Sequence, residues 1–318
     1  MEVSFLVMIQ VQSLTKKYNE NKALDSVNFE VRDGEVLGFL GPNGAGKSTT
    51  MKLITGFISP TTGTIKVDDL DVVDNSFEIR KKVGYLPETN PLYTDMKVWE
   101  YLEFVSQARQ IPKSSRRKAI KRMIDVCGLD DVIGKSIDAL SKGFRQRTGL
   151  AQAMIHDPDI LIMDEPTSGL DPNQIVEIRD LIKKIGEKKT IILSTHILPE
   201  VAATCSRVVI INNGKIVAQG TADELTAGSR GQEVVYAKIR GNREQIRSTL
   251  SEYNQVKSVE PFAGEGDDIH GFGIELVEGD GRELVYKCAV SNGWSLLELY
   301  RKQENLEDVF RRLTISEE

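Results

Sequence analysis

The chain contains few cysteines and no long apolar run. Its three cysteines, spread over 318 residues, are far apart and lack the spacing of a metal site. An odd number of scattered thiols is typical of a reduced, cytosolic protein and does not fit a disulfide framework. No apolar stretch approaches the roughly 18 residues of a membrane helix, and the N-terminus lacks the basic leader of a secretory signal. We therefore expect a cytosolic protein without a membrane span of its own.

A basic excess is missing as well. The chain has 41 Lys and Arg against 47 Asp and Glu, a formal net charge of −6. A nucleic-acid binder would carry a clear basic patch, so we expect no nucleic-acid partner. The most basic stretch, residues 113–122, lies on a helix-like segment. We interpret it as a solvated helix face, with docking to acidic lipid or to a partner as the less favoured alternative.

A complete phosphate-binding loop directly follows an apolar run. Residues 36–40 predict a buried strand, and residues 41–48 read Gly-Pro-Asn-Gly-Ala-Gly-Lys-Ser. Glycines let the backbone approach phosphates closely, and the helix that follows presents free N–H groups to an anion. Lys47 is expected to reach the β- and γ-phosphates, and the Ser48 hydroxyl to hold Mg²⁺. The predicted nucleotide-binding residues of this loop are Gly41, Asn43, Gly44, Ala45, Gly46, Lys47, Ser48 and Thr49.

A second apolar strand ends in two carboxylates. Residues 160–163 are apolar and are followed by Asp164 and Glu165. A buried strand of this kind delivers its polar end to the ligand crevice of a parallel sheet. Asp164 is expected to bind Mg²⁺, and Glu165 to accept a proton from the attacking water, which is worth roughly 10²–10⁴ in rate. The alternative is that the two carboxylates merely open a turn.

Three further segments follow in a characteristic order. Residues 140–147 read Leu-Ser-Lys-Gly-Phe-Arg-Gln-Arg, residues 164–171 read Asp-Glu-Pro-Thr-Ser-Gly-Leu-Asp, and His196 follows. Together with the phosphate-binding loop, they resemble the ATP-binding cassette ATPases, the motor subunits of ABC transporters, over residues 8 to about 220. In that family two cassettes stack head to tail, with each ATP between the P-loop of one and the signature loop of the other. The signature segment resembles ATPases of gliding-motility and related multidrug-type exporters.

The resemblance assigns roles to single residues. Tyr18 matches the aromatic side chain that stacks on adenine, with an ordinary strand-end tyrosine as the alternative. Ser141 and Gly143 match the signature positions that contact the γ-phosphate across the dimer. Asp171 matches the loop through which the two cassettes sense each other, and His196 matches the switch histidine that contacts the γ-phosphate. Lys47, Glu165 and His196 are thus the implied catalytic residues.

Two motifs depart from the family pattern. Glu88 stands where the family usually has glutamine, and it is still implied as a Mg²⁺ ligand through its oxygen. Its charge beside a triphosphate would weaken Mg-ATP binding or alter coupling to the membrane partner. In the signature loop, Lys142 replaces a glycine and Phe144 a glutamine. The positive charge of Lys142 near the γ-phosphate would compensate in part for these replacements.

The pattern along the chain predicts an α/β protein of two domains. The first is a P-loop NTPase ABC cassette with a RecA-like core, an antiparallel β lobe and a helical subdomain. We expect this cassette over residues 8–227, with the helical subdomain at about 85–145. Residues 232–318 give the order β-α-β-β-α-β of a small α+β, ferredoxin-like domain, followed by an amphipathic helix. The resemblance implies regulation or dimerisation for that domain, and a passive stabilising cap is the alternative.

The implied function is the ATP-binding and hydrolysing subunit of a bacterial ABC exporter, with ATP and Mg²⁺ as cofactors. The resemblance implies a homodimer or paired cassette with a membrane permease as a separate chain, peripheral on the cytoplasmic face of the membrane. A soluble ABC ATPase acting on ribosomes or nucleic acid is disfavoured by the single P-loop and by the short segment between Ser48 and Leu140. A catalytically impaired ATP-binding regulator is opposed by intact Lys47, Glu165 and His196.

Overall fold

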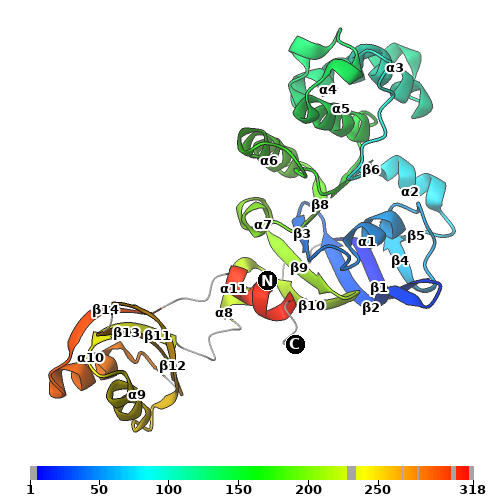
Figure 1. The fold of residues 1–318 in the computed structure, drawn as a ribbon. Coiled ribbons are helices and arrows are strands. Elements are labelled where there is room, and N and C mark those ends of the chain that lie inside the picture. The colour runs from blue at the N-terminus through cyan, green and yellow to red at the C-terminus, as the bar shows by residue number, and fades with distance from the viewer. Residues whose placement is uncertain (1–5, 228–233, 267, 278, 302–305, 315–318) are drawn as a thin grey trace. The chain divides into compact units, whose positions relative to one another are not determined.

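The computed structural model describes residues 6–227, 234–266, 268–277, 279–301 and 306–314 (Figure 1). The chain divides into two compact units. One contains the described residues up to Ala222 together with Leu313 and Thr314, and the other those from Asp223 to Arg312. Among the described residues, no helix has the length and hydropathy that a membrane span requires.

A six-stranded sheet forms the centre of the first unit, in the order β10-β9-β3-β8-β7-β6. Its strands are β3 (Val36–Leu40), β6 (Val83–Leu86), β7 (Ile160–Asp164), β8 (Thr190–Thr195), β9 (Arg207–Asn212) and β10 (Lys215–Gly220). All neighbours are parallel except β10, which pairs with β9 in the antiparallel sense. Every residue of β7 and β8 is buried, as expected for parallel strands that are covered on both faces. The carboxyl ends of β3, β7 and β8 therefore meet at one edge, where ligands bind in such sheets.

An antiparallel lobe packs against this sheet. Its strands are β1 (Val7–Tyr18), β2 (Asn21–Arg32), β4 (Thr62–Val67) and β5 (Leu70–Asp71), in the order β2-β1-β4-β5. Alternate residues of β1 and β2 are buried, because only one face of the lobe meets the core. Phe29 of β2 and Phe39 of β3 join the two sheets with ring centroids 5.3 Å apart.

Some helices of the first unit lie beside the sheets, and others form a separate group at the top of Figure 1. They are α1 (Lys47–Ile54), α2 (Ser76–Lys82), α3 (Val98–Ala108), α4 (Lys113–Cys127), α5 (Lys142–Met154), α6 (Pro172–Gly186) and α7 (Leu198–Thr204). The helices α3, α4 and α5 pack together as the helical subdomain. Each turns an apolar face inward, as in α4, whose buried residues are Ile120, Met123, Ile124 and Cys127. Gly128 ends α4 with φ +63°, the left-handed conformation that glycine adopts at helix ends.

The second unit has the element order predicted from the sequence. It contains β11 (Val234–Arg240), α9 (Arg243–Ser251), β12 (Val256–Glu265), β13 (Ile269–Leu276), α10 (Arg282–Ser291) and β14 (Ser295–Arg301). The four strands pair in the antiparallel order β12-β13-β11-β14, and α9 and α10 cover the apolar face of this sheet. The short helix α8 (Ala222–Ala227) precedes β11, and α11 (Leu306–Thr314) follows β14.

The end of α11 makes contact with the first unit. Leu313 and Thr314 belong to the expected domain of residues 232–318 and group with the first unit. The amide of Asn212 in β9 donates to the carbonyl oxygens of Leu313 and Thr314, at 3.3 and 3.4 Å. These two hydrogen bonds give the physical reason for the grouping, and they involve backbone oxygens that no sequence pattern marks.

Candidate nucleotide site

The glycine-rich loop connects β3 to α1 at the carboxyl edge of the central sheet. Gly44 and Gly46 have φ of +80° and +111°, which favour glycine, and space is open beside Gly44. A Cβ on Gly41 would clash with the Ile211 carbonyl oxygen, so only glycine fits there too. The loop thus leads into the N-terminus of α1, whose first N–H groups have no partner within the helix. This geometry suits an anion such as a phosphate.

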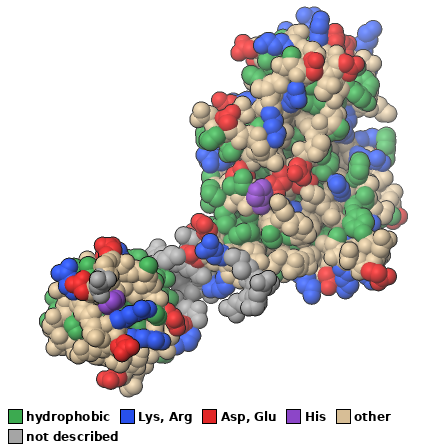
Figure 2. Space-filling model, viewed as in Figure 1, with side chains coloured by type: hydrophobic (Ala, Val, Ile, Leu, Met, Phe, Trp, Pro, Cys, Tyr) green, Lys and Arg blue, Asp and Glu red, His purple; other side chains and the backbone are tan. Residues whose placement is uncertain are grey.

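A cavity of about 340 Å³ lies against this loop. It is lined by Ala23, Asn43, Gly44, Gly46, Lys47, Ser48, Thr49, Glu88, Glu165, Ser168 and His196. The structure therefore brings most of the predicted loop residues together with Glu88, Glu165 and His196. On the visible face of the first unit, acidic side chains lie beside a histidine (Figure 2).

Three charged or titratable side chains form a connected group in this cavity. The Lys47 Nζ lies 3.2 Å from Glu165 Oε1 and donates to the carbonyl oxygens of Gly41 and Pro42, at 2.8 and 3.1 Å. The other carboxylate oxygen of Glu165 lies 2.8 Å from His196 Nδ1. Glu165 therefore holds both a cation and an imidazole at the place where a phosphate would approach.

The backbone at Glu165 is strained. Its φ is +49°, in the left-handed region that a non-glycine residue seldom adopts. The Glu165 N–H donates to the carbonyl and hydroxyl oxygens of Ser194, each at 3.1 Å, which holds this conformation. The Ser194 hydroxyl in turn donates to Asp164 Oδ1 at 2.5 Å. Strain that is held by surrounding hydrogen bonds is typical of functional sites.

The three predicted Mg²⁺ ligands line one neighbouring cavity of about 510 Å³. Ser48, Asp164 and Glu88 all belong to it, together with Tyr85. The Tyr85 hydroxyl is buried, and among the described residues it has no hydrogen-bond partner. Burial, followed by the charges of Asp164 and Glu88, raises the pKa of Tyr85 well above its usual value. Hydroxyl and carboxylate oxygens are the ligands Mg²⁺ prefers, so the donor set fits that ion.

Comparison with known proteins gives the family. Residues 24–168 match the model of the ABC transporter family. The chain is 33% identical to the ABC transporter ATP-binding protein YxlF of Bacillus subtilis, over 96% of this chain and 99% of that protein. It is also 33% identical to the bacitracin transport ATP-binding protein BcrA of Bacillus licheniformis, over 96% of this chain and 97% of that one. The chain belongs to the ABC transporter family.

A solved structure supports the same conclusion for the chemistry. A dimeric ATP-binding cassette in a post-hydrolysis state, bound to ADP and phosphate, superposes with a TM-score of 0.62 and 26% identity. The superposition covers 67% of this chain and 98% of the chain in the solved structure. The predicted family, fold class and ATPase activity are thus confirmed. This chain is the ATP-binding, ATP-hydrolysing subunit of an ABC transporter.

The remaining predicted site residues lie outside the nucleotide cavity of this ABC subunit. The Ser141 hydroxyl caps α5 and accepts from the Phe144 N–H at 3.3 Å, with Gly143 in the first turn of the same helix. Asp171 caps α6. Tyr18 ends β1, and Lys16 Nζ lies 5.2 Å from its ring centroid. None of these four residues lines the nucleotide cavity, and their roles stay predictions.

Sequence reasoning missed one polar network behind the catalytic group. Glu200 of α7 is 3% exposed, and its carboxylate accepts from the hydroxyls of Thr167 and Thr195, at 2.5 and 2.8 Å. Thr195 directly precedes His196, so its place at the end of an apolar strand was a usable signal. Glu200 gave none, because a glutamate in the first turn of a helix is ordinary.

Proposed function

We propose that this subunit powers a bacterial exporter as one half of a head-to-tail cassette dimer. The observation that carries the proposal is the group of Lys47, Glu165 and His196 at the P-loop, with Glu165 joined to both other side chains. Such a group can bind phosphate, accept a proton and sense the γ-phosphate. Names of relatives such as the bacitracin transport protein BcrA support an export role.

The residues at the P-loop divide the work of binding. Backbone N–H groups at the start of α1 hold the phosphates, and Lys47 turns from Glu165 toward them. Ser48, Asp164 and Glu88 would hold Mg²⁺, which would neutralise phosphate charge when bound. Glu165 then holds the attacking water and takes its proton, while His196 contacts the γ-phosphate.

A second cassette supplies what one chain lacks. Ser141, Gly143 and Asp171 lie outside the cavity of their own chain, which fits a role at the ATP of a partner cassette. ATP drives the cycle only if it binds the closed dimer better than the open one. Hydrolysis at Glu165 removes that difference and lets the dimer reopen.

An aromatic groove of about 700 Å³ is the place we assign to the permease, a separate chain. Phe77, Tyr93 and Phe104 are exposed there, beside Arg80 and Arg109. Exposed aromatic and arginine side chains are enriched at interfaces. The groove adjoins the loop that carries Glu88, so docking would be sensed at the nucleotide site. Such docking would place the subunit on the cytoplasmic face of the membrane.

The proposed domain limits are 8–227 for the cassette and 232–318 for a regulatory or dimerisation domain. Residues 228–231, between these limits, lie outside the described residues. The compact core of the second unit, built around Phe272, Ile246 and Val285, supports an independent fold for it. We propose no nucleic-acid partner, in line with the acidic balance of the chain.

The test is light scattering on the Glu165→Gln variant, with and without Mg-ATP. The variant should bind ATP without hydrolysing it, so a closed dimer accumulates only with Mg-ATP. A further Ser141→Arg change should abolish that dimer, because it blocks the signature contact. A dimer in both conditions would move dimerisation to the second unit. A monomer throughout, or a wild type that releases no phosphate, would contradict the proposal.

A further inference from the structure

The helix α4 carries a row of cations on its exposed face. Four of these side chains form neither an ion pair nor a hydrogen bond among the described residues: Lys113, Arg117, Lys118 and Lys121. Their spacing of four, five and eight residues from Lys113 puts them on one side of the helix. The opposite side packs into the core of the helical subdomain. We call these four residues the cationic row.

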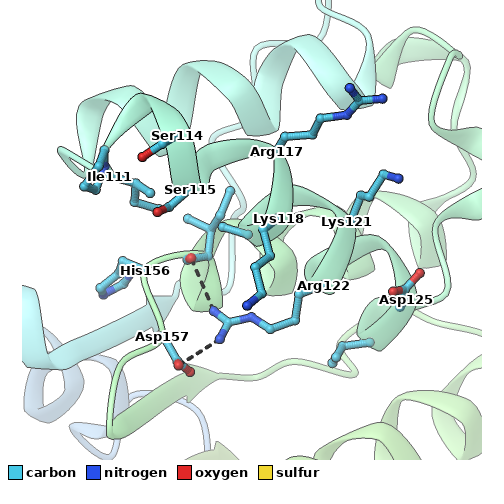
Figure 3. A pocket seen from close by; sticks show the side chains of 14 residues that line it. Ile111, Ser114, Ser115, Arg117, Lys118, Lys121, Arg122, Asp125, His156 and Asp157 are labelled. Atoms are coloured by element: carbon cyan, nitrogen blue, oxygen red, sulfur yellow. Dashed lines mark hydrogen bonds and ion pairs between the residues drawn. The ribbon is translucent and has the colours of Figure 1, made fainter.

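Three residues of the row, Arg117, Lys118 and Lys121, line a hollow of about 1020 Å³ between α4 and residues 155–157 (Figure 3). Arg122, at the floor, is already paired: its guanidinium lies 2.8 Å from Asp157, which also binds Lys189 at 2.8 Å. Arg117 and Lys121 point away from this pair (Figure 3). Of the two carboxylates that line the hollow, Asp157 is therefore neutralised, and only Asp125 opposes the positive charge of the row.

The hollow is continuous with the aromatic groove assigned to the permease. Ile111, Pro112 and His156 line both. A permease lies in the bilayer, so the surface beside its docking groove is the part of this unit nearest to lipid headgroups. The inner leaflet is anionic, and clusters of four to eight Lys and Arg near it are typical of headgroup binding. Cytoplasmic permease loops are themselves enriched in Lys and Arg, and would be repelled by the row.

We propose that the cationic row of α4 binds the anionic headgroups of the membrane beside the permease. This inference rests on the proposed function, because it uses the place of the permease groove. The chain as a whole carries a net charge of −6, so attraction to an anionic surface must come from a local patch. The attraction acts within a Debye length, about 8 Å at physiological salt, so the row must lie close to the surface.

The test is co-sedimentation of the full-length chain with lipid vesicles. The wild type should bind vesicles with about one third phosphatidylglycerol in phosphatidylcholine, and not pure phosphatidylcholine. Replacing all four residues of the row by glutamine should weaken that binding at least about thirtyfold. The matched control neutralises Lys183 and Lys184 of α6 and Lys188 just after it. These are exposed cations far from the groove residues in sequence, and the control should keep the binding.

Several results would overturn the proposal. If the row variant binds vesicles as well as the wild type, or if the α6 control loses as much binding as the row variant, the cationic row does not determine vesicle binding. Binding of an acidic peptide but not of vesicles would assign the row to a protein partner instead. ATP hydrolysis by the same samples is the separate readout for the proposed function. Both variants should hydrolyse ATP like the wild type.

A second, independent observation concerns Glu200. Its two carboxylate oxygens join the loop after β7, through Thr167, to the end of β8, through Thr195. The Thr195 hydroxyl also accepts the Ile197 N–H at 3.0 Å, which fixes the turn around His196. Glu165 lies two residues before Thr167. The carboxylate of Glu200 therefore bridges the two segments that carry the catalytic pair.

The burial of Glu200 is costly. Among the described residues it forms no ion pair, so its charge is compensated by two hydroxyl donors and by the N-terminus of the short helix α7. A buried carboxylate without a cation is destabilising, and a neutral side chain would fill the same space at lower cost. A residue that departs from the usual pairing of buried charges, at a cost in stability, usually marks a functional site.

The geometry points to Glu200 as a positioning residue that sets the distance between Glu165 and His196. In the full-length chain, Glu200→Gln should lower kcat by about tenfold or more. The KM for ATP should stay within about threefold of the wild-type value, because the P-loop is untouched. In a His196→Ala background the same change should have little further effect, since the residue it positions is gone. Glu187→Gln, on an exposed glutamate, is the matched control.

A structural role alone would give a different pattern. An equal additional loss in the His196→Ala background, or a fall in Tm that parallels the fall in kcat, would overturn the assignment. Hydrogen exchange supplies a second readout that needs no hydrolysis. Glu200→Gln should speed exchange in residues 165–168 and 194–197 together, and an unchanged pattern would contradict the bridge.

Discussion

The Lys47 Nζ lies 3.2 Å from Glu165 Oε1, and both side chains are almost completely buried. The lysine expected to bind phosphate is thus held by the carboxylate expected to accept a proton. In this arrangement neither group is ready for its role, because each neutralises the other. A phosphate bound at the P-loop offers Lys47 a second anion. When the Lys47 side chain moves from Glu165 to this phosphate, the Glu165 carboxylate becomes available to a water molecule.

Breaking this pair on one side should destabilise the protein. We expect Lys47→Met to lower the free energy of unfolding by about 3 kcal/mol, because it leaves a buried carboxylate uncompensated. Lys47→Met/Glu165→Gln should recover most of that loss. Chemical denaturation measures both. Lys81→Met, which breaks the exposed pair with Glu78, is the control and should cost less than about 1 kcal/mol. Equal losses in the single and double variants would contradict the coupling.

Glu88 adds negative charge where Mg-ATP is expected. It lines both the nucleotide cavity and the neighbouring cavity with Ser48 and Asp164. Glu88→Gln keeps the shape and the oxygen, and should tighten Mg-ATP binding by roughly three- to tenfold through lost repulsion. Titration with a fluorescent ATP analogue measures this. The gain should shrink at high salt, and a weaker affinity would mean that the carboxylate is the better Mg²⁺ ligand.

His156 predicts a specific pH dependence of stability. Burial, with a smaller contribution from Arg109, lowers its pKa to about 4. Its unfolded value is about 6.5, so between these values the unfolded chain binds more protons. The free energy of unfolding should therefore fall as pH drops through this window, by at most about 1.4 kcal/mol per pKa unit.

The measurement is Tm as a function of pH for the wild type and for His156→Gln. Other groups titrate in the same window, so the difference between the two curves carries the prediction. The wild-type Tm should drop more steeply between about pH 6.5 and about pH 4. Parallel curves would show that His156 keeps an ordinary pKa in the folded protein.

The parts of the site that could be predicted from the sequence are those formed by residues next to one another in the chain. The P-loop and the Asp164–Glu165 pair are continuous segments at strand ends, and parallel strands bring their ends to one edge. The bridge by Glu200 was not predictable, because it joins Thr167 and Thr195 through a side chain with no motif. Tyr18 illustrates the reverse case. Its motif is local, yet its contact with adenine depends on a ligand that the sequence only implies.

The contact between Asn90 and Gly149 was equally hidden, and it yields the last prediction. The Asn90 side chain lies directly on Gly149 of α5, where a Cβ would overlap its amide. Its Nδ2 also donates to the Arg145 carbonyl oxygen at 3.3 Å. The loop that carries Glu88 therefore rests on the helix that begins at Ser141. We expect this contact to couple the nucleotide site to the signature loop.

Gly149→Ala should disturb that coupling more than it disturbs the fold. Alanine favours a helix over glycine by about 1 kcal/mol, which offsets part of the clash. In the Glu165→Gln background, dimer formation should need roughly two- to thirtyfold more Mg-ATP, the range of typical coupling energies. Asn90→Ala alone, which removes the contact, should raise the requirement to a similar extent, and adding it to Gly149→Ala should have little further effect. Gly134→Ala, where a Cβ meets open space, is the control. A Gly149→Ala dimer that forms at the original Mg-ATP concentration would show that the two sites communicate by another route.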